Sequence, residues 1–188
     1  MKQKELKKLT TGSILAAIAV VLGVIIKYTP GINLEMPNGG AVFGIYIVPV
    51  ILSGMILGYK YGILTGLIYG VVSWLLDGYV IHWGSIFFDY LIPFSLMGFA
   101  GSLFYGKGLS NWKNIVFAFL IAAVFRWIMH GFSGVLFFQQ YAGDYNPWFY
   151  SFIIYNAPYV FAGATISLVI TLIIRKPLVD LTKELQLN

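Results

Sequence analysis

The sequence predicts an all-α integral membrane protein with six transmembrane helices and both termini in the cytoplasm. Two properties of its composition support this class: 59% of the 188 residues are hydrophobic, and only 10% are charged. The mean hydropathy of +0.83 is too high for a soluble domain of this length. The hydrophobic residues also form long uncharged runs, as transmembrane helices require. We therefore expect residues 1–188 to form a single domain of a multi-pass protein of the cell membrane.

The first predicted span, residues 11–28, follows a cluster of lysines and is rich in small residues. We interpret it as a retained helix, because it lacks the small-residue cleavage site of a secretory signal. The loop after it contains Pro30, Pro37 and several glycines, which exclude a regular helix there. Pro49 falls inside the second span, where neighbouring helices can satisfy the carbonyl that a proline leaves free. The five later spans are predicted at residues 41–57, 61–76, 85–105, 113–138 and 148–174.

The distribution of charge along the chain predicts its orientation in the membrane. If both termini lie on one side, ten of the twelve Lys and Arg residues lie there too, whereas Lys27 falls on the opposite side and Arg126 inside the fifth span. Cytoplasmic loops carry the excess of Lys and Arg, so this side is the cytoplasm. Its basic residues are Lys2, Lys4, Lys7, Lys8, Lys60, Lys107, Lys113, Arg175, Lys176 and Lys183, and the opposite side holds Glu35, Asp77, Asp89 and Asp144.

Small residues recur at every fourth position in two parts of the chain. The first series runs from Gly54 to Gly70 through the second and third spans, and it predicts close packing of helices inside the bundle. Ser13 and Ala17 repeat the same spacing in the first span. There a partner protein is an alternative to internal packing.

Three polar side chains in apolar surroundings, Asp89, His130 and Asn156, belong to three different predicted helices. At a rise of about 1.5 Å per residue, His130 lies roughly 25 Å from the cytoplasmic Lys113, and all three fall in the outer half of the membrane. Ionisable residues at this depth are costly and mark functional sites. We therefore predict that the three share one small-molecule pocket.

Each of these residues also has a structural alternative. Asp89 can be an acid stabilised by the dipole at a helix N-terminus, His130 can bond a carbonyl, and one interhelical hydrogen bond would explain Asn156. Pro93 deprives the carbonyl of Asp89 of its helical partner, so we expect a locally opened helix there. We interpret Arg126, one turn below His130, as structural rather than ligand-contacting.

One acid among aromatic residues, with no second acid paired to it, suits a flat cationic or heteroaromatic ligand. The carboxylate balances the charge, and ring faces add a cation–π attraction of about 2 kcal/mol when desolvated. The sequence contains no hydrolase elbow, metalloprotease helix or P-loop, and no cysteine. We expect no enzymatic activity, metal, cofactor or nucleic-acid partner, and uptake driven by ATP would need a partner protein.

Four segments of the chain carry a resemblance to a known family: residues 36–40 (MPNGG), 88–91 (FDYL), 126–138 (RWIMHGFSGVLFF) and 150–156 (YSFIIYN). They resemble the ThiT family, the thiamine-specific substrate-binding (S) components of energy-coupling factor (ECF) transporters. The similarity runs in order along nearly the whole chain. It implies a six-helix S-component that binds thiamine from outside and docks on a transmembrane coupling protein with two ATPases.

Matched position by position, the resemblance implies a ligand site built from three helices. The family's tyrosine before its asparagine falls on Ser151, and Tyr150 stands one place earlier, so either residue is the candidate. The implied ligand contacts are Asp89, Tyr90, His130, Gly134, Phe138, Tyr150 or Ser151, and Asn156.

The sequence departs from the family pattern at the acid and at the stacking aromatic. Asp89 stands where some members have Glu, and Phe138 where some have Trp. The first loop contains no tryptophan that would make a lid contact. The family's coupling face on the first helix corresponds to Ser13 and Ala17, which favours a partner interface over internal packing there.

Two alternatives to a thiamine S-component stay open at this point. Within the same class, the ligand could be a thiamine precursor or another flat heterocyclic vitamin. In a different class, an intramembrane enzyme could use Asp89 and His130 as acid and base.

Overall fold

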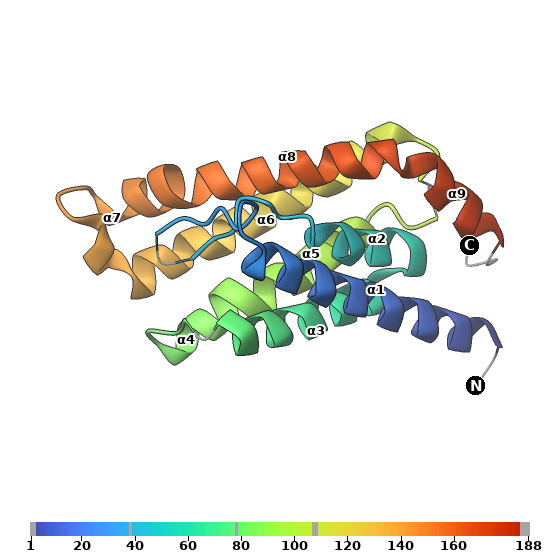
Figure 1. The fold of residues 1–188 in the computed structure, drawn as a ribbon, viewed down its shortest axis with the longest axis horizontal. Helices are drawn as coiled ribbons and strands as arrows, with labels where there is room; N and C mark the ends of the chain where they lie inside the picture. Colours follow the sequence, from blue (N-terminus) through green and yellow to red (C-terminus); the bar gives the residue numbers. More distant parts are fainter. Residues whose placement is uncertain (1–2, 38, 78, 107–108, 185–188) are drawn as a thin grey trace.

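The helices of the protein lie side by side along one long axis (Figure 1). The computed structural model describes residues 3–37, 39–77, 79–106 and 109–184, so Lys2, Asn38 and Lys107 lie outside the described residues. Its helical segments are α1 Gln3–Tyr28, α2 Ile47–Leu57, α3 Tyr59–Asp77, α4 Trp83–Ser85, η1 Ile86–Leu91, α5 Ile92–Ser102, α6 Trp112–Phe137, η2 Gln139–Ala142, α7 Pro147–Phe149, η3 Tyr150–Asn156, α8 Ala157–Ile173 and α9 Arg175–Glu184.

The all-α membrane class is confirmed by the length and apolarity of these helices. Within the described residues, four continuous stretches are long and apolar enough to cross a membrane: α1, α4 to α5, α6, and α7 to α8. α3 has 19 residues and covers the third predicted span. α2 has 11 residues, which at about 1.5 Å each fall short of a hydrocarbon core of about 30 Å. The count of six spans therefore stays a prediction.

The predicted start of the second span is wrong, because α2 begins at Ile47 rather than at residue 41. The residues before it continue the loop from α1, and Gly39 and Gly40 adopt positive φ angles of 107° and 92° there. Pro49 consequently lies in the first turn of α2 rather than in a helix interior. A first-turn proline loses no hydrogen bond, since the N–H groups of that turn have no helical acceptor.

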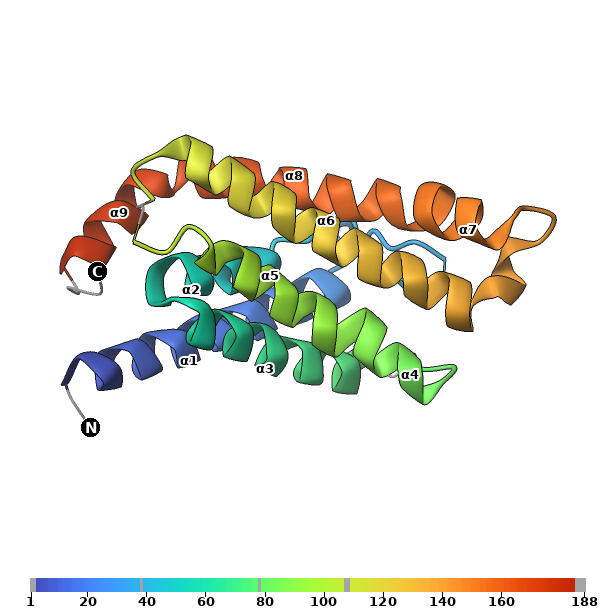
Figure 2. The same cartoon turned by 180° about the vertical axis from the view of Figure 1, so that it is seen from behind.

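Glycines allow α2, α3 and α5 to pack with their backbones in contact (Figure 2). A Cβ built at Gly62 would lie 2.8 Å from the Cα of Gly54, and one at Gly98 would overlap the carbonyl oxygen of Gly62. The predicted packing role of the glycine series is confirmed for four of its five members. Gly58 differs, because it ends α2 with a φ of 92° and serves the turn into α3.

The start of α1 and the whole of α9 lie at one end of the bundle, and α4 and α7 lie at the other (Figure 1). α9 lies beyond the end of the sixth predicted span, in a part of the chain for which the sequence predicts no helix. Lys4, Lys7 and Lys8 in α1 and Lys176 in α9 therefore share one end of the molecule.

Candidate functional site

A cavity of about 360 Å³ lies among α1, α3, η1, α6, η3, α8 and the loop between α1 and α2. Its wall includes every residue that the sequence predicts as a ligand contact: Asp89, Tyr90, His130, Gly134, Phe138, Tyr150, Ser151 and Asn156. The structure thus brings together residues from three segments that are far apart in the chain. Their role as ligand contacts stays a prediction.

Two of the helices that line the cavity open into π-helical turns that end two residues before a proline. η1 precedes Pro93 and carries Asp89, and η3 precedes Pro158 and ends at Asn156. A proline leaves the carbonyl four residues earlier without its helical donor, and the wider turn accommodates this loss. The predicted opening at Asp89 is confirmed. The matching signal from Pro158 was present in the sequence, and such turns occur often at functional sites.

Asp89 is held in place by two side chains of α6. Ser133 Oγ donates a hydrogen bond to Asp89 Oδ2 at 2.7 Å, and His130 Nδ1 lies 3.4 Å from Oδ1. The side chain of Asp89 is 20% exposed and that of His130 is 10% exposed, so the carboxylate is fixed yet still open to the cavity. Asp89 thus contacts a second helix, α6, which an acid that only stabilises the N-terminus of its own helix would not need to do. Ser133 follows His130 by three residues, so the two side chains lie on the same face of α6.

Arg126 lies in the cavity wall below His130. Its Nε donates to His130 Nε2 at 3.2 Å, and its Nη2 donates to the hydroxyl of Tyr46 at 3.0 Å. The rings of Tyr46, Phe94 and Tyr159 surround the guanidinium at 5.5 to 5.7 Å. None of the described residues accepts a hydrogen bond from its buried Nη1. Arg126 therefore contacts the bundle through an imidazole and a hydroxyl, and it also has a spare donor in a residue that lines the cavity. Its predicted structural role stays a prediction.

Asn156 and Ser151 join η3 to α6. Asn156 Nδ2 donates to the carbonyls of His130 at 3.2 Å and Ser151 at 2.8 Å, while its Oδ1 accepts from the hydroxyl of Tyr159 at 2.8 Å. Ser151 Oγ donates to a carbonyl of α6 at 2.8 Å. A Cβ at Gly134 would overlap Ser151 Oγ. Gly134 is therefore needed for the close approach of the two helices.

Tyr150 and Ser151 both line the cavity, but only Tyr150 offers a ring to it. Its ring centroid is 6.1 Å from that of Tyr155. The hydroxyl of Tyr155 donates to the backbone carbonyls of Pro37 and Gly39. Tyr155 thus ties the loop between α1 and α2 to the wall of the cavity.

An aromatic group at the edge of the cavity includes the predicted stacking residue. The ring of Phe138 stacks on Tyr79, with centroids 6.2 Å apart and an interplanar angle of 22°. The hydroxyl of Tyr79 lies 3.0 Å from that of Tyr141, and this hydrogen bond raises the pKa of Tyr79 to about 12. The Tyr79 phenol is neutral at physiological pH.

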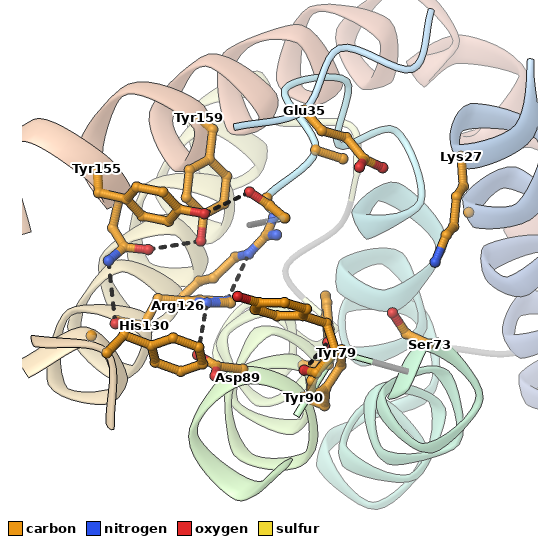
Figure 3. A pocket seen from close by; sticks show the side chains of 18 of the residues that line it. Lys27, Glu35, Ser73, Tyr79, Asp89, Tyr90, Arg126, His130, Tyr155 and Tyr159 are labelled. Atoms are coloured by element: carbon orange, nitrogen blue, oxygen red, sulfur yellow. Dashed lines mark hydrogen bonds and ion pairs between the residues drawn. The ribbon is translucent and has the colours of Figure 1, made fainter. Parts of the chain in front are cut away.

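The opposite wall carries polar residues that the sequence does not assign to the site. Lys27 from α1 and Ser73 from α3 face Arg126 across the cavity (Figure 3). Lys27 Nζ donates to the carbonyl of Leu76 at 3.0 Å. Glu35, in the loop, also lines the cavity. One feature of the sequence could have pointed to Lys27: it is the one basic residue on the predicted extracellular side, which otherwise carries acidic residues.

The predicted partner interface lies on the outward face of α1. Ser13 and Ala17 are exposed, while Gly12, Ala16 and Ala19 form the buried face of the helix. Ser13 and Ala17 therefore do not pack inside the described bundle, and their role toward a partner stays a prediction.

Comparison with known proteins places the chain in a family. Residues 9–183 match the family described as thiamine transporter protein (Thia_YuaJ). The thiamine transporter ThiT of Bacillus subtilis (strain 168) is 31% identical over 169 residues, which cover 85% of each chain. A solved structure of ThiT from Listeria monocytogenes is similar with a TM-score of 0.78 and 25% identity, over 96% of this chain and 99% of that one. This chain therefore belongs to the thiamine transporter protein family (Thia_YuaJ).

Proposed function

We propose that this chain is the substrate-binding S-component of an ECF-type importer in the cell membrane. It binds thiamine from the extracellular side and hands it to an ATP-driven module made of a transmembrane coupling protein and two ATPases. Family membership supports the transport of thiamine. Two observations support docking on a coupling module: the resemblance of the sequence to the S-components, and the exposed small residues Ser13 and Ala17 of α1.

The observation that carries the proposal is a fixed carboxylate in a cavity with aromatic walls. Asp89 is held by Ser133 and His130 before any ligand arrives, so binding a cation there requires little ordering. Thiamine carries a positive thiazolium ring that Asp89 can balance. The nearby rings of Tyr79 and Phe138 suit a flat aromatic cation, which an aromatic face attracts.

Arg126 gives the same cavity a hydrogen-bond donor. Its Nη1 is buried without an acceptor among the described residues, and a buried donor left unpaired costs about 1–3 kcal/mol. A ring nitrogen of the aminopyrimidine half of thiamine is an acceptor that would relieve this cost. We therefore assign Arg126 to the ligand site as well as to the bundle.

The orientation follows from the positions of charges and cavity. The start of α1 and α9 share one end of the molecule (Figure 1), and the lysines there favour the cytoplasm. Asp89, His130 and Asn156 lie toward the other end of their helices, near α4 and α7. With six spans and cytoplasmic termini, the cavity faces the extracellular side.

The two rival functions make different demands on the cavity. A thiamine precursor or another flat vitamin would use the same walls but need not carry a positive charge for Asp89. An enzyme would need His130 free as a base, and both of its ring nitrogens already contact protein groups. The S-component is therefore the better fit.

Isothermal calorimetry on the purified chain in detergent tests this assignment. The described cavity residues include no tryptophan, so heat is a more dependable signal than tryptophan fluorescence. Thiamine should saturate one site per chain, whereas riboflavin and the isolated pyrimidine half of thiamine should bind far more weakly. Saturation by riboflavin or by the pyrimidine half, and not by thiamine, would favour an S-component for another vitamin or a precursor. Release of a chemically altered ligand would favour an enzyme.

A further inference from the structure

We infer that Arg126 is a positioning residue that holds His130 in its neutral form with the proton on Nδ1. No imidazolium then lies beside Asp89 to compete with a cationic ligand. The identity of that ligand rests on the proposed function. The protonation of His130 does not, because it is a property of the chain without ligand.

The donors around the imidazole assign its proton. A guanidinium is permanently charged and has only N–H donors. Arg126 Nε donates to His130 Nε2 at 3.2 Å, so Nε2 must be the accepting, unprotonated nitrogen. A neutral imidazole has one N–H, which leaves the proton on Nδ1. That nitrogen lies 3.4 Å from Asp89 Oδ1, which accepts it (Figure 3).

Arg126 cannot easily release His130, because its guanidinium is held on several sides. The side chain is 3% exposed, its Nη2 donates to Tyr46, and three aromatic rings surround it. An imidazolium would place a second N–H at Nε2, directly against the N–H of Arg126. The arrangement therefore excludes protonation of Nε2 while Arg126 stays in place.

Tyr159, the other titratable group against His130, does not donate its proton to the imidazole. Tyr159 from α8 presents its ring edge-on at 6.0 Å, and its hydroxyl donates to Asn156. The charged groups that contact the imidazole are Asp89 of η1 and Arg126 of α6. Lys27 and Glu35 line the opposite parts of the cavity.

This arrangement matters for a cationic ligand. An imidazolium beside Asp89 would balance the carboxylate and repel a second cation. Because His130 stays neutral, its titration should not lower ligand affinity when the pH decreases from 8 to 5.5. Without Arg126, Nε2 no longer faces an N–H donor, so His130 can take up a second proton when the pH decreases. If the protonated form does not bind, affinity falls in proportion to the neutral fraction, which is about tenfold when nine-tenths of His130 is protonated.

The first test observes the proton directly by nitrogen NMR of the full chain in micelles, labelled with ¹⁵N-histidine. The chain has two histidines, and the variant His82→Gln identifies the signals of His130. His130 should show a protonated Nδ1 and a bare Nε2 throughout pH 8 to 5.5, without ligand. A proton on Nε2, or an imidazolium that forms within this range, overturns the inference. No change at Arg126 is needed, so misfolding of a variant cannot hide the answer.

The second test follows thiamine affinity over the same pH range in wild type, Arg126→Met and the double variant Arg126→Met with His130→Gln. Wild type controls for the titration of thiamine itself. Relative to wild type, Arg126→Met should lose affinity as the pH decreases from 8 to 5.5, by about tenfold where nine-tenths of His130 becomes protonated, and the double variant should not show this loss. A single variant that parallels wild type, or a loss that persists in the double variant, contradicts the inference. If wild type does not bind thiamine, the proposed function fails while the NMR result still decides the tautomer.

Discussion

The position of the Asp89 side chain is fixed by contacts with α6 as well as by its own helix. The π-helical turn of η1 carries the carboxylate, and Ser133 and His130 fix its two oxygens. Arg126 holds His130 in turn. The charge of the site therefore depends on a chain of contacts in which each residue orients the next.

Replacing Asp89 by asparagine tests this charge with little change in shape. Asn can still accept from Ser133, so the fold should survive. The loss of a buried charge partner should weaken thiamine binding by about 2–5 kcal/mol, measured by calorimetry. Glu35→Gln is the matched control, since it neutralises a second carboxylate of the cavity wall and should have a much smaller effect. Equal affinities for Asp89→Asn and wild type would remove Asp89 from the site.

At this scale the sequence identifies the ionisable residues but not their partners. Asp89 and His130 stand out because charge is expensive in an apolar run. Ser133 does not, because small residues are common in membrane helices. Its role depends on the approach of η1 to α6, which no local pattern records. The cavity position of Arg126 is likewise set by rings from three other segments.

At the scale of elements, the loop between α1 and α2 forms part of the cavity wall. Its backbone is organised by hydrogen bonds from Met36 N–H to the carbonyl of Gly40 at 3.0 Å and from Val42 N–H to that of Leu34 at 2.8 Å. Tyr155 fastens this loop to η3. We therefore expect the loop to act as a lid that becomes more ordered over bound ligand.

Tyr155→Phe should loosen this lid and leave the ring in the cavity wall. One hydrogen bond contributes about 0.5–1.5 kcal/mol, so amides of the loop should exchange up to about tenfold faster in the ligand-free variant. Hydrogen exchange followed by mass spectrometry measures this. Tyr150→Phe is the control, because the Tyr150 hydroxyl makes no hydrogen bond to the described part of the loop. Equal protection of the loop in all three proteins, or no added protection on thiamine binding, would argue against a lid.

The elements themselves were predictable where the apolar pattern is long. α6 and the stretch from α7 to α8 match the predicted spans to within one residue at each end, whereas α1 begins eight residues before its span. The opening at Asp89 follows from Pro93. The start of α2 was not predictable in the same way, because residues 41–46 are as apolar as the helix after them. Their course is set by contacts with α8, where Gly44 meets Gly163 and accepts a hydrogen bond from Ser167.

At the scale of the whole molecule, the cavity and the exposed small residues of α1 occupy different regions. Ser13 and Ala17 lie on the exposed face of α1, nearer its start than the residues of α1 that line the cavity, of which the first is Val20. Mutation can therefore test the proposed ligand site and the proposed partner face separately.

Ser13→Trp combined with Ala17→Trp should abolish thiamine uptake by cells and leave binding by the purified chain unchanged. Bulky side chains would hold a partner helix away from a surface that small residues keep flat. Val169→Trp, at a half-exposed position of α8, controls for tryptophan on a lipid-facing surface and should not reduce uptake. Uptake that survives the double change would place the coupling surface elsewhere.

We propose that this chain binds thiamine but needs an ATP-driven partner to move it. Accumulation of radiolabelled thiamine in proteoliposomes tests it most directly. The chain alone should bind about one thiamine without accumulation, and addition of the coupling module with ATP should produce accumulation inside the vesicles. Accumulation by the chain alone, or failure to bind thiamine at all, would contradict the account.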